Sequence, residues 1–448
     1  MSGLFEAAAP RWFTIAAHRP FLDDLAAHLW RELSPLGPEA LSEAVILVPN
    51  RRAARALGAA FLEAAGTRAL LPPQIRAIGD LDEAEPPFEP ADAALDLPAA
   101  ITPERRRFEL AGLVAAHGHL LDRNIDAAAA LDLADALARF LDSCQIEELD
   151  GPPDLAALAP GELARHWEAS VRFLDIALTA WPARLAELGL MDVAARRATL
   201  LRRLADRWRR APPDEVLIAA GSTGSTRATA DLLAAVAAAP RGLVVLPGLD
   251  HSLAESAWRQ VGDQHPQGAL RRLLAEAGIA RAAVIPWPGS EESPGPGRWR
   301  RRLISESLRP PDSTADWLTE IEAMKAQDAQ AIEKGVAGLS VISARGEEEG
   351  AVAAALLMRE ALHTPGRTAL LVSPDAGFAR RVAAQLGRWN ITADSSVGTS
   401  LATAPAAVLA DLAARASDFD PVNLLAIVKH PLVRLGLAPA ALARARVT

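Results

Sequence analysis

VILVPNRRAARALGAAFLEAA, residues 45–65, joins a short apolar run to a longer stretch of helix-forming residues. The run Val45–Val48 is apolar at every position, which is typical of a strand buried on both faces of a parallel sheet. Alanine, leucine and arginine then dominate from about Arg52 to Ala65 and favour a helix. The same order occurs at Trp12–Ala16, where an apolar run precedes a turn and leucines at helical spacing. Strands that alternate with helices predict an α/β fold.

Further strand signals divide the chain into segments. We expect strands at 75–78, 215–220, 243–246 and, more weakly, 282–286, whereas the apolar spacing between 103 and 210 is helical. A second set begins with LSVIS (339–343) and ALLVS (369–373). The sequence therefore predicts two doubly wound parallel-sheet domains, the first interrupted by an all-helical insertion. The expected boundaries are 1–102 and 211–297 for the first domain, 103–210 for the insertion, 298–335 for a helical linker, and 336–448 for the second domain.

Composition restricts the classes of function. The chain has 448 residues and carries 47 basic and 56 acidic side chains, a net charge of -9. A small DNA-binding domain is usually basic, so any nucleic-acid surface here must be local. The single cysteine, Cys144, excludes a disulfide framework and an all-cysteine cluster and fits a cytoplasmic protein. We expect neither a signal peptide nor a membrane span, and the acidic, proline-rich stretch 81–103 predicts an exposed connection.

The turn after the first expected strand lacks the chemistry of a phosphate loop. That loop needs glycines, whose backbone amides wrap the phosphates, and a lysine that reaches the outer phosphates. Residues 16–20, Ala-Ala-His-Arg-Pro, contain neither, and Pro20 removes a donor. ATP hydrolysis by this chain is therefore not expected. His18 and Arg19 are interpreted as a polar turn rather than as phosphate ligands.

Two segments that follow expected strands are candidate DNA-binding sites. At Asn50, Arg51, Arg52 and Arg55, an amide and three guanidinium groups surround a helix start, and such a start favours phosphate. The alternative is an ordinary N-capped helix with a solvated basic face. In Gly221–Thr226, small residues permit close approach of a ligand. The candidate contacts there are Ser222, Thr223 and Ser225, and the alternative is a turn in which Thr226 caps the next helix.

Other polar groups are weaker candidates. Glu347–Glu349 begin an expected helix, where the helix dipole favours carboxylates, and we interpret them as structural. Three arginine clusters, two with a neighbouring tryptophan, are suited either to stacking with single strands or, more commonly, to solvated helix faces. His251 and His265 have no partner that suggests catalysis. The clusters are Arg105–Arg107; Arg202, Arg203, Arg207, Arg209 and Arg210; and Arg298 with Arg300–Arg302.

The order of these segments resembles the AddB subunit of the AddAB helicase–nuclease, in the form found in alphaproteobacteria. Asn50 with its basic neighbours resembles the single-strand-binding motif that superfamily 1 helicases carry after their second strand. The resemblance covers residues 11 to about 440. It rests on HRPFLDDLAAHL, ILVPNRRAARALGAAFL, LLPPQIRAIGD, VLIAAGSTGSTRATADLL, LVVLPGLD, SARGEEEGAVAAALLMREAL, TALLVSPDAGFARRVAAQL and LLAIVKHPLVRLG, in that order.

The resemblance implies two RecA-like domains and a role in processing DNA double-strand breaks for homologous recombination. In the family, AddA is the ATP-driven helicase partner, and AddB helps to bind DNA ends and single strands. The family's second nuclease, with its iron–sulfur cluster and magnesium, lies in a C-terminal domain that this sequence does not contain. The resemblance therefore implies a non-catalytic, DNA-guiding part of AddB without a cofactor of its own. An inactive remnant is the alternative that the sequence leaves open.

Overall fold

The computed structural model describes residues 4–5, 8–78, 96–118, 125–149, 174, 176–289, 296–396, 398, 401, 404–418, 420–434, 436–437 and 441. The acidic stretch expected at 81–103 falls partly outside these residues, as does part of the helical insertion expected at 103–210. The chain divides into two compact units, unit 1 at Met1–Gly338 and unit 2 at Leu339–Thr448. This division falls three residues from the expected start of the second domain.

A six-stranded sheet forms the centre of unit 1. The strand order is β3-β2-β6-β7-β1-β8, and each pairing is parallel. Strand β1 thus lies between β7 and β8, which come much later in the sequence. The strands expected in unit 1 are confirmed, although the one expected at 282–286 is reduced to two residues. The strands are β1 (Trp12–Ile15), β2 (Val45–Val48), β3 (Gln74–Ala77), β6 (Leu217–Ala220), β7 (Gly242–Pro247) and β8 (Ile285–Pro286).

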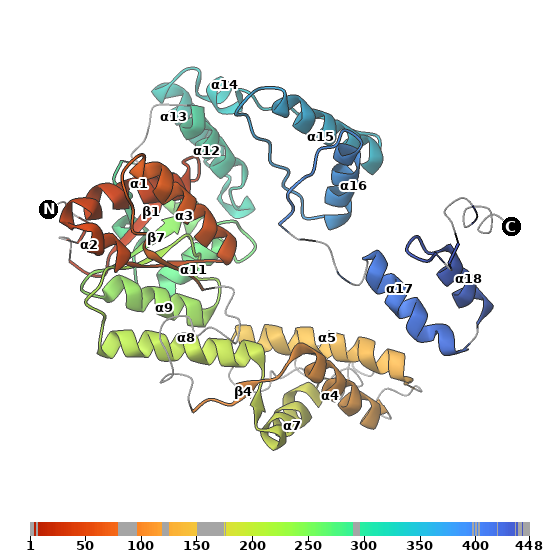
Figure 1. Cartoon of the computed structure of the whole chain (residues 1–448). Coiled ribbons are helices and arrows are strands. Elements are labelled where there is room, and N and C mark those ends of the chain that lie inside the picture. The colour runs from red at the N-terminus through yellow and green to blue at the C-terminus, as the bar shows by residue number, and fades with distance from the viewer. Residues whose placement is uncertain are drawn as a thin grey trace. The chain divides into compact units, whose positions relative to one another are not determined.

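One face of this sheet is covered by α1 (Phe21–Leu33) and α3 (Arg51–Ala65), with the short α2 (Pro38–Ser42) beside them. Alternate strand residues such as Ile46 and Ile218 point to this face and are fully buried. Because successive side chains of a strand point to opposite faces, their neighbours point to the other side. Figure 1 shows α1 and α3 together on this side of the strands.

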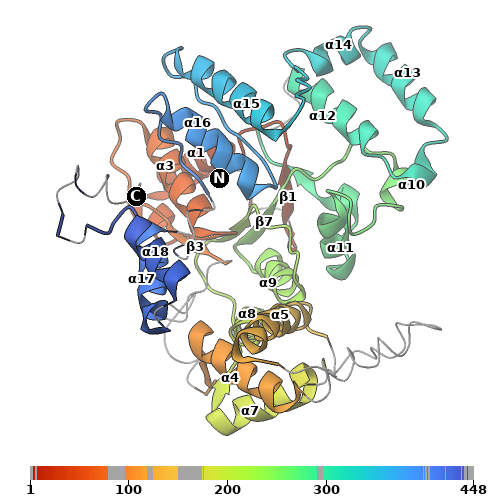
Figure 2. The same cartoon turned by 90° about the vertical axis from the view of Figure 1, so that its right-hand side faces the viewer.

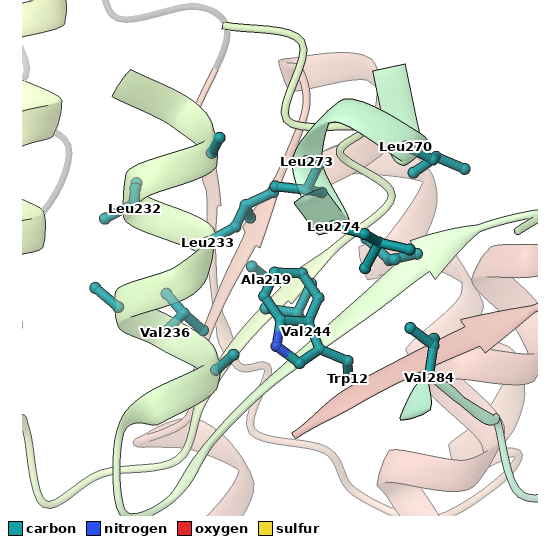
Figure 3. Packing of buried hydrophobic residues seen from close by; sticks show 14 of the residues in the cluster. Trp12, Ala219, Leu232, Leu233, Val236, Val244, Leu270, Leu273, Leu274 and Val284 are labelled. Carbon is teal, nitrogen blue, oxygen red and sulfur yellow. The ribbon is translucent and has the colours of Figure 1, made fainter. Parts of the chain in front are cut away.

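The opposite face packs against α9 (Arg227–Ala238) and α11 (Gly268–Glu276), with the short α10 (Glu255–Trp258) nearby, and α8 (Val193–Arg210) packs against α9. Figure 3 shows Leu233 of α9 and Leu274 of α11 on the side of the strand residues Trp12, Ala219 and Val244. The core therefore has two layers, one on each side of the sheet. Because the strands are buried on both faces, their sequences are apolar at successive positions rather than at alternate ones.

A helical subdomain separates β3 from β6. Its own core contains Trp181 and Leu110, and helices α4 and α5 pack side by side. The insertion was expected to be all-helical, but two short strands pair in parallel across it, and its last helix, α8, packs against α9, which covers the main sheet. The elements are β4 (Ala99–Ala100), α4 (Pro103–Ala116), α5 (Ala127–Ile146), a π-helix (Ile176–Ala180), α7 (Trp181–Leu188) and β5 (Leu190–Met191).

Three helices complete unit 1 beyond β8, as expected for a helical stretch. They are α12 (Pro296–Ser307), α13 (Trp317–Gln327) and α14 (Ala331–Val336). Trp299 of α12 packs with Met324 and Ala331 in a small apolar cluster. Figure 2 shows these helices gathered in one group.

Unit 2 does not contain the strands that the sequence predicts at 339–343 and 369–373. Both segments are described and neither pairs in a ladder. Leu371 packs under α15 and α16, whereas Leu370 and Val372 are 87% and 84% exposed. An apolar run becomes a strand only where a neighbouring strand pairs with its backbone, and no described segment does so here. The helices are α15 (Glu347–Leu362), α16 (Ala376–Gly387), α17 (Pro405–Ala414) and α18 (Pro421–Lys429).

The helices that the structure describes are too short or too polar to cross a lipid bilayer.

Candidate nucleic-acid interface

The sheet of unit 1 has two places where neighbouring strands send the chain to opposite faces. After β2 the chain enters α3 on one face, whereas after the adjacent β6 it enters α9 on the other. After β1 it enters α1, whereas after the adjacent β7 it leads to α11 on the opposite face. Open α/β sheets bind ligands outside the carboxyl ends of the strands at such points. We use the names β2/β6 crevice and β1/β7 crevice for these two strand-end regions, which are defined by the strand order and not by a measured cavity.

The first candidate segment lies on the β2 side of the β2/β6 crevice. Asn50 is the N-cap of α3, and its Oδ1 accepts a hydrogen bond from the backbone N–H of Ala53 at 2.8 Å. Arg51, Arg52 and Arg55 are all exposed. The N-capping alternative is therefore confirmed for Asn50, and capping starts α3 where the basic side chains reach solvent. This site presents three cationic side chains at a helix start.

The second candidate segment lies on the β6 side of the same crevice. A Cβ atom on Gly221 would lie 3.5 Å from Cδ of Pro49 and 3.4 Å from the ring of Phe21. The backbone of Gly221 has a φ of 79°, which glycine adopts without strain. The loop after β6 therefore meets the residue that precedes Asn50, and the two candidate segments form one surface.

The hydroxyl groups of the second segment differ in their surroundings. Ser222 Oγ accepts a hydrogen bond from the backbone N–H of Gly224 at 3.3 Å, Thr223 is half-buried, and Ser225 is exposed. Thr226 caps α9 by accepting from the N–H of Thr229, as the capping alternative predicted. The crevice thus combines guanidinium groups, hydroxyls and backbone amides, which are groups that contact phosphate and sugar.

The arginine clusters that the sequence singled out are engaged in other contacts. Arg107 pairs with Asp135 at 2.9 Å, Arg202 with Glu148 at 2.7 Å, and Arg209 with Asp231. In the third cluster, Arg300 donates to the carbonyl of Gly335 at 2.9 Å. The two neighbouring tryptophans, Trp208 and Trp299, are buried in apolar clusters. These contacts support the structural interpretation and make these tryptophans unsuitable as stacking platforms for bases.

The carboxylates at the start of α15 also have structural partners. Glu347 pairs with Arg381, Glu348 accepts from Gln385 at 2.6 Å, and Glu349 pairs with Arg345 at 3.2 Å. These contacts join α15 to α16 and fix the start of α15. In the described part of the chain, His, Cys, Asp and Glu side chains nowhere form a group of three suited to hold a metal ion.

The β1/β7 crevice holds Arg19, which the sequence singled out, and Asp250, which it did not. Arg19 is paired with Asp24 at 2.7 Å, so it belongs to a polar turn, as expected. Asp250, which follows β7, is buried and accepts hydrogen bonds from Ser252 and from Ser305 of α12. Burial opposes its ionisation, but these hydrogen bonds, a further one from the Ser252 N–H and the charge of Arg301 together outweigh burial and lower the pKa of the Asp250 carboxyl. Asp250 and Ser305 are 55 residues apart, so no local sequence pattern indicates their contact.

Charged residues are also buried where α12 ends. Glu306 and Arg309 form an ion pair at 3.5 Å, with side chains 3% and 1% exposed. Burial raises the pKa of Glu306, although the charge of Arg309 acts in the opposite direction. His251 is partly buried, and this burial together with the charge of Arg281 lowers its pKa. None of these groups belongs to the candidate segments at the β2/β6 crevice.

Comparison with models of known protein families gives no match for this chain, and a search of curated proteins likewise finds no match.

Proposed function

We propose that this chain is a non-catalytic, helicase-like part of AddB that binds and guides DNA while AddAB resects double-strand breaks in the cytoplasm. The proposal includes a RecA-like character for unit 1, a related second domain built on unit 2, and AddA as the partner subunit. It rests on the resemblance of the ordered sequence motifs. It assigns DNA contacts to Asn50, Arg51, Arg52, Arg55, Ser222, Thr223 and Ser225.

One observation carries the DNA-binding part of this proposal. Two segments about 170 residues apart, each interpreted from sequence as a DNA contact, flank the same crevice of a parallel sheet. The crevice is the kind of place where such sheets bind ligands, and three exposed arginines give it positive charge. A local basic surface also agrees with the net charge of -9 of the whole chain.

No part of the proposed role requires the chain to hydrolyse ATP. The turn after β1 has no glycine or lysine that would hold phosphates, and in the family AddA supplies that activity. The chain would therefore guide the DNA strand beside the ATP-driven helicase AddA. It would hold the strand with phosphate contacts, which fix register and orientation without reading sequence.

The proposal is tested with the full chain, alone and mixed with AddA from the same organism. Binding to a fluorescent single strand, and to a duplex with a single-stranded tail, is measured by anisotropy at several salt concentrations. We compare Arg51→Ala/Arg52→Ala with Arg105→Ala/Arg107→Ala, which removes the same charge from arginines that pair with Glu109 and Asp135.

We expect the first variant to bind more weakly and to lower the slope of log affinity against log salt. Each lost single-strand phosphate contact contributes about 0.7 to that slope, so the change is roughly 1.4. The control variant should bind as the wild type does. Equal binding by both variants would reject the assigned contacts. Absence of binding to DNA and to AddA would instead favour an inactive remnant.

A further inference from the structure

The N-terminal end of α12 lies directly on the turn that follows β1. A Cβ atom on Gly297 would approach Cδ2 of His18 to 2.9 Å and its Cβ to 3.1 Å. A Cβ atom at 2.9 Å would force the His18 ring to move, so glycine lets the helix pack this close to His18. The turn after β1 is one wall of the β1/β7 crevice. Helix α12 therefore covers this wall.

The C-terminal half of α12 is attached to the opposite wall of the crevice. Ser305 donates a hydrogen bond to the buried carboxylate of Asp250 in the loop after β7. That loop is fixed further by Gln267, which donates to the carbonyl of Gly248 and accepts from the N–H of Asp250, both at 3.0 Å. Hydrogen bonds to a charged acceptor are stronger than neutral ones. A single helix thus contacts both strand ends that border the crevice.

Just beyond α12, a third contact holds the chain to the same region. His265 Nε2 lies 3.0 Å from the carbonyl oxygen of Leu308, and its Nδ1 accepts from the N–H of Gln267 at 3.0 Å. This pattern requires the neutral tautomer with the proton on Nε2. The same Gln267 supports the loop after β7, so the contacts form one connected network.

The far side of α12 is joined to the segment that leads out of unit 1. Arg300 donates to the carbonyl oxygens of Gly335 and Ala337, at 2.9 and 2.5 Å, and Trp299 packs against Ala331. Residue 338 is where unit 1 ends. Movement of α12 away from the crevice would therefore disturb the chain at 331–337 as well.

We propose that α12 is an internal plug of the β1/β7 crevice, which closes this edge of the sheet to nucleotides and couples it to residues 331–337. The plug occupies one of the two places where this sheet can accept a ligand. The β2/β6 crevice remains as the binding edge. This inference does not depend on DNA binding, and its test uses no DNA.

The test is hydrogen–deuterium exchange on the full chain. Gly297→Leu places a branched side chain against His18, and Gly112→Leu is the matched control, since nothing lies within 4 Å of a Cβ at that helical glycine. We expect Gly297→Leu alone to raise exchange roughly tenfold at residues 16–20, 248–254 and 331–337, which is the effect of losing a hydrogen bond to a charged group. Wild-type exchange at these loops should not change with millimolar Mg-ATP, and a fluorescent ATP analogue should not bind.

Two results would overturn the plug. The first is a Gly297→Leu variant whose amides at 16–20 and 248–254 exchange at the same rate as in the wild type. The other is protection of these loops by Mg-ATP in the wild type. Should Gly297→Leu not fold, Ser305→Ala removes only the hydrogen bond to Asp250. It should raise exchange at 248–254 by a similar factor, and unchanged exchange there would equally reject the proposal.

Discussion

Gly221 and Pro49 meet at the carboxyl edge of the sheet, where a Cβ atom on Gly221 would lie 3.5 Å from Cδ of Pro49. The loops after β6 and β2 are thereby in contact, although about 170 residues separate them. The contact arises because β2 and β6 are neighbours in a parallel sheet, so their carboxyl ends lie at the same edge. The candidate interface depends on this one pairing.

Gly221→Ala should destabilise unit 1 through the backbone. With φ at 79°, a residue with a Cβ atom is strained by roughly 1–3 kcal/mol, whereas the space around the new methyl group is sufficient. We expect a lower urea midpoint, monitored by circular dichroism. Gly112→Ala is the control, and it should stabilise the chain by about 0.5–1 kcal/mol because alanine favours a helix interior. Equal midpoints for wild type and Gly221→Ala would contradict the strain argument.

Asn50→Ala should loosen the start of α3. The substitution removes the acceptor for the Ala53 N–H, and loss of such a cap costs about 1 kcal/mol. Amides at 51–55 should then exchange several times faster with deuterium. Asn50→Ser retains an acceptor and should exchange at nearly the wild-type rate. Were Asn50→Ser to lose DNA binding while it keeps this protection, the amide itself would be identified as a DNA contact.

Arg106 and Arg107 are adjacent but should differ strongly in importance. Arg106 is buried and lies 2.8 Å from Asp142 and 2.9 Å from Asp192, which is 1% exposed. Arg106→Met leaves Asp192 buried without its cation, which typically costs 3–5 kcal/mol. Arg107→Met breaks only an exposed pair with Asp135, which is worth about 0–1 kcal/mol.

Urea unfolding of the two methionine variants distinguishes these effects. A large loss for Arg106→Met should be partly recovered in Arg106→Met/Asp192→Asn, because asparagine removes the unpaired charge. Similar midpoints for the two single variants would show that the Arg106 pair contributes no more than a surface ion pair.

Glu306 should make the stability of unit 1 depend on pH. Burial raises its folded pKa above the unfolded value, against the effect of Arg309, while Arg302, Glu320 and Asp250 also face it. The folded state therefore binds the proton more tightly. Its contribution is fully present below the unfolded pKa and is lost as pH rises through the folded pKa.

Glu306→Gln removes this titration. We expect the variant to show a flatter dependence of melting temperature on pH as the pH rises above 4, because its amide does not titrate. Asp312→Asn, on the nearby exposed residue, is the control. A wild-type-like pH profile in Glu306→Gln would assign the dependence to another group.

Local features of the sequence determined the elements of unit 1. Val45–Val48 is apolar at every position because both of its faces are buried, and Asn50 and Thr226 cap helices with their own side chains. Such signals act over a few residues and need no knowledge of the rest of the fold. They also sufficed to place both candidate segments just after strands.

Tertiary structure decided which elements meet. The order β3-β2-β6-β7-β1-β8 joins strands from distant parts of the chain, and Asp250 receives Ser305 from a helix 55 residues away. Leu370 and Val372 lie in an apolar run that has no neighbouring strand among the described residues. This run does not form a strand, and both side chains are exposed. Helix hydrogen bonds and caps form within a few residues, so sequence alone predicts them. A strand takes its backbone partners from elsewhere in the chain, so only the folded chain determines them.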